Sequence, residues 1–267
     1  MNEKSSMITL LTDFGLSDAY VGIMKGVIWQ ISPQVKIVDI THNIPPQDIY
    51  TASLTLKKAL PFFPKGTVHT AVIDPGVGTL RRPIAMVVNG HYFVGPDNGL
   101  FSHIIVDAKK KKHGIKIYHL NNQRYWLKNI SNVFHGRDIF APSAAHIAQG
   151  IPLDDMGIMI NDPVELKLPR LTISSNTITG EIIQIDHFGN IETNIEKSIL
   201  KGVVNLKIKI KGLTIERIIN TFAEGEDGEI VAIFDSSDYL SINKVNGNAA
   251  KDMKVSMGTK IEIILRS

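Results

Sequence analysis

The first half of the chain alternates short apolar runs with longer stretches whose apolar residues recur at helical spacing. The apolar runs are rich in β-branched residues, as buried strands are, and they occupy residues 7–12, 35–40, 68–73, 84–88 and 92–94. The helix-like stretches follow the 3.6-residue period of an amphipathic helix and occupy residues 18–31, 49–60 and 140–148. Strands that alternate with helices predict an α/β domain in which helices flank a mostly parallel sheet.

The pattern changes beyond about Pro169. Short β-rich segments separated by Gly, Asn and Asp turns follow at residues 182–185, 204–210, 230–234 and 261–265. This pattern predicts a small antiparallel sheet or barrel. We expect an N-terminal α/β domain over residues 1–165 and a C-terminal β domain over residues 175–267.

Composition excludes several classes of protein. The net charge of +3 is too small to indicate a nucleic-acid partner, and the basic run at 109–112 is typical of a solvated loop. The chain has no cysteine, which excludes disulfides, thiolate metal sites and a cysteine nucleophile. Its start lacks the long apolar core of a signal peptide, and no segment approaches the ~20 apolar residues that span a bilayer. We therefore expect a cytoplasmic protein with no membrane partner.

Polar loops follow three of the predicted strands. TDFG (12–15) carries Asp13, DITHNIPP (39–46) follows the second strand, and DPGVGT (74–79) carries Asp74. Ligands of open parallel sheets bind at the carboxyl ends of the strands, so Asp13 and Asp74 are expected at one edge. The alternative is that each aspartate forms a turn or caps a helix. PDNGL (96–100) is a fourth loop of this kind, or an ordinary type I turn.

The segment VFHGRDIF (133–140) places His135, Arg137 and Asp138 within four residues, just before a predicted helix. A neutral imidazole near a carboxylate and a guanidinium can orient or deprotonate a small nucleophile. The alternative is that Asp138 caps the helix and that His135 is a structural loop residue. The other histidines lack metal-ligand spacing, and the sequence has no GxGxxG, GxxxxGK[ST] or GxSxG motif. A metal, a nicotinamide cofactor, a P-loop nucleotide and a serine nucleophile elbow are therefore not predicted.

Two loops of the second half carry side chains suited to a ligand. In IDHFGNIETN (185–194), Asp186 can accept hydrogen bonds, Phe188 can stack on a flat ring, and Asn190 can bind a polar edge. The stretch 234–250 offers hydroxyls, an aromatic ring and exposed backbone around glycine. Both stretches also fit plain β-turns and loops.

These segments occur together in one order along the chain. The motifs are TDFG, DxTH, GTVHxxVIDPGVGTxRR, PDNGL, FHGRDIF, DxFGN and, late in the chain, DYL followed by NGNAA. This series resembles the S-adenosyl-L-methionine (SAM) hydroxide adenosyltransferase family, also called SAM hydrolases, which is related to fluorinase and chlorinase. The resemblance covers almost the whole chain, and DPGVGTxR together with FHGRDIF is its most specific part.

The resemblance implies that SAM and water react to give adenosine and L-methionine, with SAM as substrate and no cofactor or metal. It implies a C-terminal β-barrel and a homotrimer whose sites lie between the N-terminal domain of one subunit and the C-terminal domain of a neighbour. The triad of the family matches Asp74, Arg81 and His135, with Arg82 as the alternative arginine. A carboxylate, a guanidinium and an imidazole can align a water molecule opposite the sulfonium, whose methionine leaves as a neutral group.

The resemblance also implies the substrate contacts. Asp13 would bind the ribose, Asp186 and Asn190 the methionine and nearby polar groups, and Phe188 would flank the adenine. The edge of the adenine would meet two loops, represented by Ser236, Tyr239, Asn248 and Ala250. Fluorinase has an extra loop and lacks the histidine, whereas this chain has His135 and no comparable insertion, so water is the favoured nucleophile. A SAM-dependent halogenase and a non-catalytic SAM- or adenosine-binding protein remain as alternatives.

Overall fold

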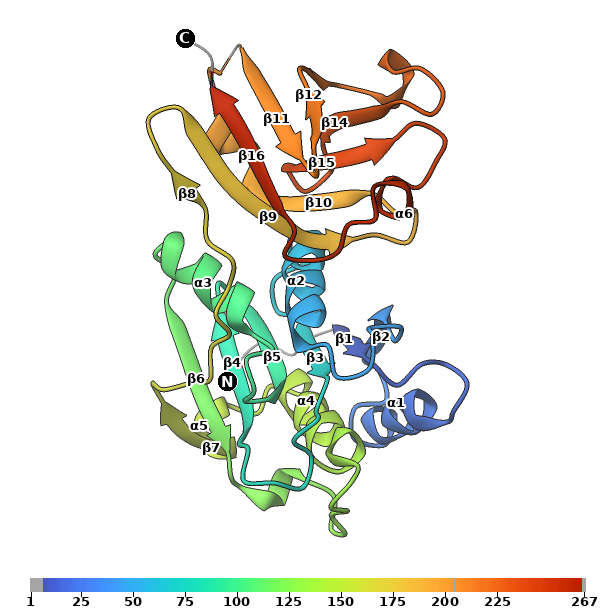
Figure 1. The fold of residues 1–267 in the computed structure, drawn as a ribbon. Helices are drawn as coiled ribbons and strands as arrows, with labels where there is room; N and C mark the ends of the chain where they lie inside the picture. The colour runs from blue at the N-terminus through green and yellow to red at the C-terminus, as the bar shows by residue number, and fades with distance from the viewer. Residues whose placement is uncertain (1–6, 204, 266–267) are drawn as a thin grey trace. The chain divides into compact units, whose positions relative to one another are not determined.

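The fold is described from a computed structural model for residues 7–203 and 205–265 (Figure 1). The chain divides into two compact units, Met1–Lys167 and Leu168–Ser267. The polar start of the chain and Val204, the first residue of one predicted strand, lie outside the described residues.

The first unit contains a seven-stranded sheet in the order β2-β1-β3-β5-β4-β6-β7. The strands are β1 (Met7–Thr12), β2 (Lys36–Thr41), β3 (Val68–Val72), β4 (Pro83–Val88), β5 (His91–Pro96), β6 (Ile115–Leu120) and β7 (Gly157–Ile160). β2, β1, β3 and β5 are parallel neighbours, β4 runs against both β5 and β6, and β7 runs against β6. The predicted, mostly parallel sheet is therefore confirmed, with β4 and β7 as its reversed strands.

Helices cover both faces of this sheet. α1 (Tyr20–Ile31) and α4 (Ala141–Ala148) lie side by side and share one core cluster, whereas α2 (Ile49–Ala59) and α3 (Ser102–Lys110) belong to the other (Figure 1). The strands divide their side chains between the two clusters because successive residues of a strand face opposite sides. Leu10 and Leu11 of β1 accordingly belong to different clusters.

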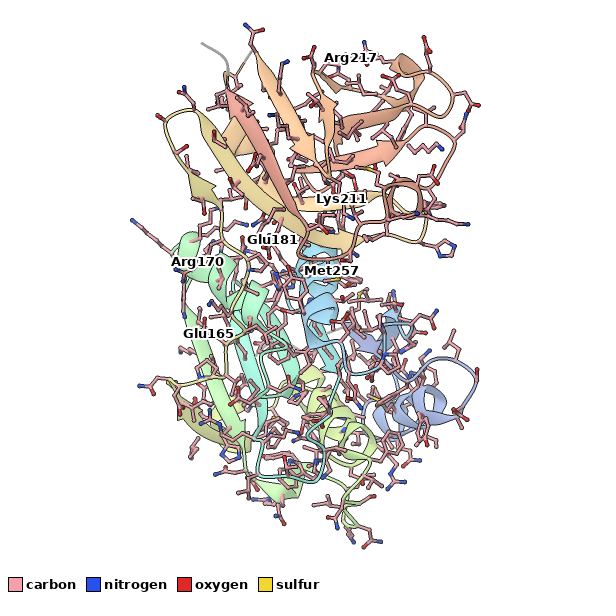
Figure 2. The ribbon with its side chains drawn as sticks, viewed as in Figure 1. Glu165, Arg170, Glu181, Lys211, Arg217 and Met257 are labelled. Atoms are coloured by element: carbon pink, nitrogen blue, oxygen red, sulfur yellow. The ribbon has the colours of Figure 1, made fainter. Side chains whose placement is uncertain are left out.

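Several elements of this unit differ from the sequence prediction. α3, the short helix α5 (Leu153–Met156), β6 and β7 were not predicted. The basic run at 109–112 is partly helical, since Lys109 and Lys110 form the last turn of α3, where positive charge favours a helix end. Lys109 also pairs with Glu165, which Figure 2 labels (Nζ to Oε1, 2.6 Å). Ile104, Ile105 and Ala108 are buried at helical spacing, so the sequence does carry the pattern of this helix, although it was not predicted.

The second unit is a strongly curved, nearly closed barrel-like sheet (Figure 1). Its hydrogen-bonded order is β12-β11-β16-β9-β10-β15-β14-β13, with β8 beside β9. The strands are β8 (Thr172–Ile173), β9 (Thr177–Ile185), β10 (Ile191–Glu196), β11 (Leu206–Ile210), β12 (Leu213–Ile215), β13 (Ile218–Ile219), β14 (Ile230–Phe234), β15 (Tyr239–Lys244) and β16 (Lys260–Leu265). The pairs are antiparallel apart from β13 and β14 among the described strands. This agrees with the predicted C-terminal β-barrel fold.

Part of what the sequence predicts as loop in this unit is regular structure. Within 234–250, residues Tyr239–Lys244 form β15 and helix α6 (Ala249–Met253) begins. Ser241 and Asn243 are polar, yet both side chains are buried in the strand.

No helix within residues 7–203 and 205–265 combines the length and the apolar character needed to cross a bilayer.

Candidate active site

Asp13 and Asp74 lie at one edge of the N-terminal sheet. β1 and β3 are parallel neighbours with Thr12 opposite Val72, so the loops that follow them leave the sheet together. Both aspartates line a cavity of about 390 Å³, a volume typical of small-molecule sites. The cavity is lined by Asp13, Phe14, Tyr20, Pro46, Gln47, Val72, Asp74, Pro75, Val77, Val133, Phe134, His135 and Gly136.

The Asp74, Arg81 and His135 side chains form one connected group. Arg81 Nε lies 2.9 Å from Asp74 Oδ1 and 3.1 Å from Oδ2, and Arg81 Nη2 donates to Oδ2 as well. The same Nη2 lies 2.7 Å from His135 Nδ1. The Asp74 and Arg81 side chains are only 6% and 9% exposed, so this ion pair is largely withdrawn from water. Arg81 also stacks over the ring of Phe140, 5.1 Å from its centroid.

The turn between Asp74 and Arg81 folds back on itself because its glycines make room. A β-carbon at Gly76 would lie 3.3 Å from Cγ of Arg81, and one at Gly78 would lie 2.4 Å from the carbonyl oxygen of Asn132. Gly78 also has a φ of +77°, which glycine adopts without strain. The space that these glycines leave is filled by Arg81 and by the loop that leads to His135.

Arg82 points to a different set of partners. Its Nε lies 2.8 Å from Asp97 Oδ2, and its other nitrogens donate to the side chain and the backbone carbonyl of Asp162. Of the two candidate arginines, the structure therefore places Arg81 beside Asp74 and His135.

His135 immediately precedes a π-helical turn, Gly136–Phe140, that runs directly into α4. Single π turns of this kind are frequent at functional sites. Asp138 lies inside the turn, fully buried, and does not cap the helix. Its Oδ2 accepts a hydrogen bond from the Ser131 amide (2.7 Å) and its Oδ1 one from Arg137 Nε (2.6 Å). Asp138 and Arg137 thus brace the loop before His135 and lie outside the connected group.

The environment of His135 favours a neutral ring. Burial lowers the pKa of His135 below its usual value, and the positive charge of Arg81 lowers it further, against weaker raising effects of Asp74, Asp138 and the Ser131 backbone. A guanidinium has no acceptor, so Nδ1 must accept the hydrogen bond from Arg81. The neutral ring therefore carries its proton on Nε2 and can donate from that atom.

The loop that holds Asp13 is fixed by the DITH segment. Thr12 Oγ1 lies 2.9 Å from His42 Nδ1, and the Gly15 amide donates to the His42 carbonyl (2.8 Å). His42 Nε2 lies 3.1 Å from Asp39 Oδ1. Burial raises the pKa of Asp39, but hydrogen bonds from Lys25 and His42 outweigh it, so this pKa is lowered overall.

Asp13 and three aromatic rings complete the N-terminal cavity. Asp13 Oδ2 accepts a hydrogen bond from the Gln47 amide (2.8 Å). Phe14, Tyr20 and Phe134 contact one another at centroid distances of 5.1 to 5.9 Å and form an apolar wall. This wall was not predicted, although Phe14 and Phe134 belong to the TDFG and FHGRDIF motif regions.

A second cavity, of about 310 Å³, lies within the C-terminal unit. It brings together three predicted site residues: Asp186, Asn190 and Ser236. Asp186 also organises its own loop, since it accepts hydrogen bonds from the Phe188 amide (2.9 Å), the Asn190 amide (2.8 Å) and the Asn190 side chain (2.9 Å). The remaining lining residues were not predicted from the sequence: Gln184, Glu192, Phe222, Ile233, Phe234, Asp235, Ser241 and Asn243.

The other predicted contacts of this unit do not line that cavity. The Phe188 side chain is 72% exposed, and Tyr239 is buried in β15. Asn248 caps α6 by accepting a hydrogen bond from the Lys251 amide (2.8 Å). The Ala250 amide donates to the Gly189 carbonyl (3.0 Å), which ties the start of α6 to the DHFGN loop.

Across residues 7–203 and 205–265, no group of three or more His, Asp or Glu side chains is arranged to hold a metal ion.

Comparison with protein families matches both units. Residues 8–157 match the SAM hydroxide adenosyltransferase N-terminal domain, and residues 180–262 match the SAM hydroxide adenosyltransferase C-terminal domain.

Similar proteins align over nearly the whole chain. An (R)-S-adenosyl-L-methionine hydrolase from Salinispora tropica is 35% identical and covers 96% of this chain and 97% of its own. A protein of the same name from Methanocaldococcus jannaschii is 37% identical, with coverage of 97% and 95%. A fluorinase from Actinoplanes sp. is more distant, at 28% identity with coverage of 96% and 97%. The crystal structure of an uncharacterized conserved protein from Thermotoga maritima superposes with a TM-score of 0.88 at 36% identity, covering 97% of this chain and all of that one.

Proposed function

This chain belongs to the SAM hydroxide adenosyltransferase family, and we propose that it hydrolyses SAM to adenosine and L-methionine, with Asp74, Arg81 and His135 acting on the water. The relatives named as SAM hydrolases are more similar to it than the fluorinases, which supports water over halide as the nucleophile.

The connected group of Asp74, Arg81 and His135 is the observation that carries the proposal. A carboxylate, a guanidinium and a neutral imidazole meet at the wall of one cavity, and Asp74 and His135 both line it. A water molecule in that cavity can contact an acceptor and a donor at the same time, which fixes its orientation. Fixing the attacking water is the main contribution that this reaction asks of an enzyme.

The chemistry needs little besides this orientation. Methionine leaves the sulfonium of SAM as a neutral thioether, so no acid is required to expel it. The water oxygen forms a bond to C5′ while the bond from C5′ to sulfur breaks, and sulfur keeps the electron pair. The attacking water loses one proton, so the products are adenosine, methionine and H⁺.

The geometry of the group points to Asp74 as the first acceptor of that proton. Arg81 has no acceptor atom, and Nδ1 of His135 is occupied by the hydrogen bond from Arg81. A carboxylate oxygen can accept a further hydrogen bond beyond those from Arg81. His135 would then hold the oxygen of the nucleophile from Nε2, and Arg81 would stabilise the negative charge that develops on it.

The proposed substrate contacts fall into two sets, one in each unit. Asp13 would bind the ribose hydroxyls in the N-terminal cavity, beside the wall of Phe14, Tyr20 and Phe134. In the C-terminal unit, the proposed contacts with the methionine and the adenine are Asp186, Phe188, Asn190, Ser236, Tyr239, Asn248 and Ala250. In the homotrimer that we propose, a site would draw these two sets from different subunits. A cytoplasmic location, like the trimer, stays a prediction.

Incubation with SAM in H₂¹⁸O tests the proposal. We expect adenosine and methionine in equal amounts, with ¹⁸O in the 5′-hydroxyl of adenosine, and far slower release by an Asp74→Ala variant. If chloride in the buffer gave 5′-chloro-5′-deoxyadenosine as the main product, the protein would be a halogenase. A folded protein that bound SAM and released no adenosine over hours would be a binding protein.

A further inference from the structure

The PDNGL segment contacts both ends of the loop that carries Asp74 and Arg81. It follows β5, which is the parallel neighbour of β3, so it leaves the sheet at the same edge as Asp74. The Asn98 side chain donates from Nδ2 to the carbonyl oxygen of Ile73, 2.9 Å away. Ile73 directly precedes Asp74, so this hydrogen bond fixes the peptide group that joins Ile73 to Asp74.

Asp97 makes the corresponding contacts at the other end of the loop. Its amide donates to the Arg82 carbonyl (2.9 Å), and its carboxylate accepts from Arg82 Nε (2.8 Å). Arg82 directly follows Arg81. The Asp97 side chain is 2% exposed, so both contacts lie in a buried setting where hydrogen bonds hold geometry well.

We infer that Asp97 and Asn98 form a positioning pair that sets the separation of Asp74 and Arg81. Two consecutive residues directly after β5 hold Ile73 and Arg82, the neighbours of the two proposed catalytic residues. The loop in between, residues 74–81, closes through its own turn hydrogen bonds and the Asp74–Arg81 pair. The inference rests on the proposed function, because its consequence is a rate.

A purely local role for Asn98 is the competing explanation. Its Oδ1 accepts a hydrogen bond from the Leu100 amide (3.2 Å), as the first residue of an ordinary turn would. The substitution Asn98→Asp separates the two roles. It keeps the size and the acceptor for the Leu100 amide, but it loses the donor and sets a carboxylate oxygen against the Ile73 carbonyl.

Asn122 offers a matched control. Its Nδ2 donates to the Asp155 carbonyl (2.7 Å), and its Oδ1 accepts from the Arg124 amide (3.3 Å). Asn122 follows β6 and does not line the N-terminal cavity. Asn122→Asp therefore removes the same kind of bond at a place that holds no proposed catalytic residue.

Steady-state kinetics on the full-length protein tests the inference. We expect Asn98→Asp to lower kcat roughly 10- to 100-fold, the size of effect that small misplacements of catalytic groups produce, with KM for SAM within about twofold. Asn122→Asp should keep kcat within about twofold. An unchanged kcat in Asn98→Asp would overturn the inference, and so would an equal loss in the Asn122→Asp control.

A readout that needs no turnover separates this inference from the proposed function. The ¹⁵N shifts of His135 report whether Nδ1 still accepts from Arg81, and Asn98→Asp should change them while Asn122→Asp should not. If the wild-type protein had no hydrolase activity but the His135 shifts changed in Asn98→Asp and not in Asn122→Asp, the proposed function would be wrong and the positioning pair would stand. Unchanged His135 shifts in Asn98→Asp would contradict the positioning pair and leave the proposed function untouched.

Discussion

Arg81 donates a hydrogen bond from Nη2 to Nδ1 of His135 over 2.7 Å, and this contact decides what the histidine can do. A ring that accepts at Nδ1 and is neutral has its proton on Nε2. Such a ring orients a nucleophile by donating to it and cannot take its proton at the same time. In the proposed reaction, Asp74 would therefore accept a hydrogen bond from the water and His135 would donate one to it.

Removal of either partner should affect turnover far more than binding. We expect Asp74→Ala and His135→Ala to lower kcat by roughly 10²- to 10⁴-fold, the range that positioned acid–base groups contribute. The affinity for SAM, measured by calorimetry, should change by less than about tenfold. His113→Ala is the control, since His113 lies just beyond α3 and does not line the cavity. Equal losses in turnover and affinity would make these residues a binding site.

The two adjacent arginines should behave differently. Arg81→Lys cannot keep both the two-oxygen contact with Asp74 and the bond to His135, so we expect kcat to fall by about 100-fold or more. Arg82→Lys keeps the backbone bond from Asp97 to residue 82 and should cost less than about tenfold in kcat. Its main effect should be a lower melting temperature, because Arg82 links Asp97 to Asp162. The reverse order of the two kcat values would show that Arg82 belongs to the triad.

The activity should resist mild acid. The pKa of His135 is lowered by burial and by Arg81, so the ring becomes half-protonated only below pH 6.5. Protonation abolishes the acceptor at Nδ1, and kcat/KM should fall through a pKa below 6.5. An NMR titration of His135 should give the same value, and Arg81→Met should raise it. An acid limb above pH 6.5 would contradict this assignment.

The sequence predicted the N-terminal sheet better than the C-terminal barrel, for a physical reason. Strands buried on both faces are mostly apolar runs, and β4 (PIAMVV) is of this kind. β15 buries Ser241 and Asn243 as well as Leu240 and Ile242, so its burial on both sides is not evident from its residue types. α3 was not predicted although its buried Ile104, Ile105 and Ala108 recur at helical spacing, because the basic run that ends it is typical of a solvated loop.

The candidate site, too, could be predicted from the sequence only in part. Asp13 and Asp74 could be placed at one edge because parallel neighbours end together, a rule that needs only topology. The family resemblance favours Arg81, but the residues alone leave Arg82 as an alternative, since the choice depends on how one turn folds around Gly76 and Gly78. The buried polar lining of the C-terminal cavity, such as Glu192 and Asn243, requires the pairing of strands far apart in the chain.

Stability should decline between neutral and acid pH because of buried histidines. Burial lowers the pKa of His69 to about 3, with a smaller contribution from His91, and burial lowers that of His103 to about 4. Both folded values lie below the unfolded value of 6.5, so the unfolded chain binds protons first. The stability is fully present above pH 6.5 and is lost as the pH falls towards these values, by up to about 1.4 kcal/mol per pH unit for each group.

Urea unfolding at pH 7 and pH 5 measures this decline. We expect His69→Gln to be less stable than the wild type at pH 7 but to lose less stability on going to pH 5. Combining it with His103→Gln should flatten the dependence further, because the two histidines belong to separate hydrogen-bonded groups, with Thr9 and Ser53 respectively. A His69→Gln variant with the wild-type pH dependence would show that His69 is protonated in the folded state or contributes nothing.

Gly78 should be a site where one methyl group costs both stability and rate. In Gly78→Ala the new β-carbon would lie 2.4 Å from the Asn132 carbonyl oxygen, and the φ of +77° would also be strained. Gly66 has a similar φ of +86°, yet nothing lies within 4 Å of its virtual β-carbon, so Gly66→Ala is strained only in its backbone conformation.

We expect Gly66→Ala to cost about 1 kcal/mol of unfolding free energy, and Gly78→Ala at least about 1 kcal/mol more. Because Asn132 belongs to the loop that ends at His135, Gly78→Ala should also lower kcat by roughly tenfold or more, while Gly66→Ala leaves it unchanged. Equal unfolding free energies and equal kcat values for the two variants would show that the turn and the His135 loop are not in tight contact.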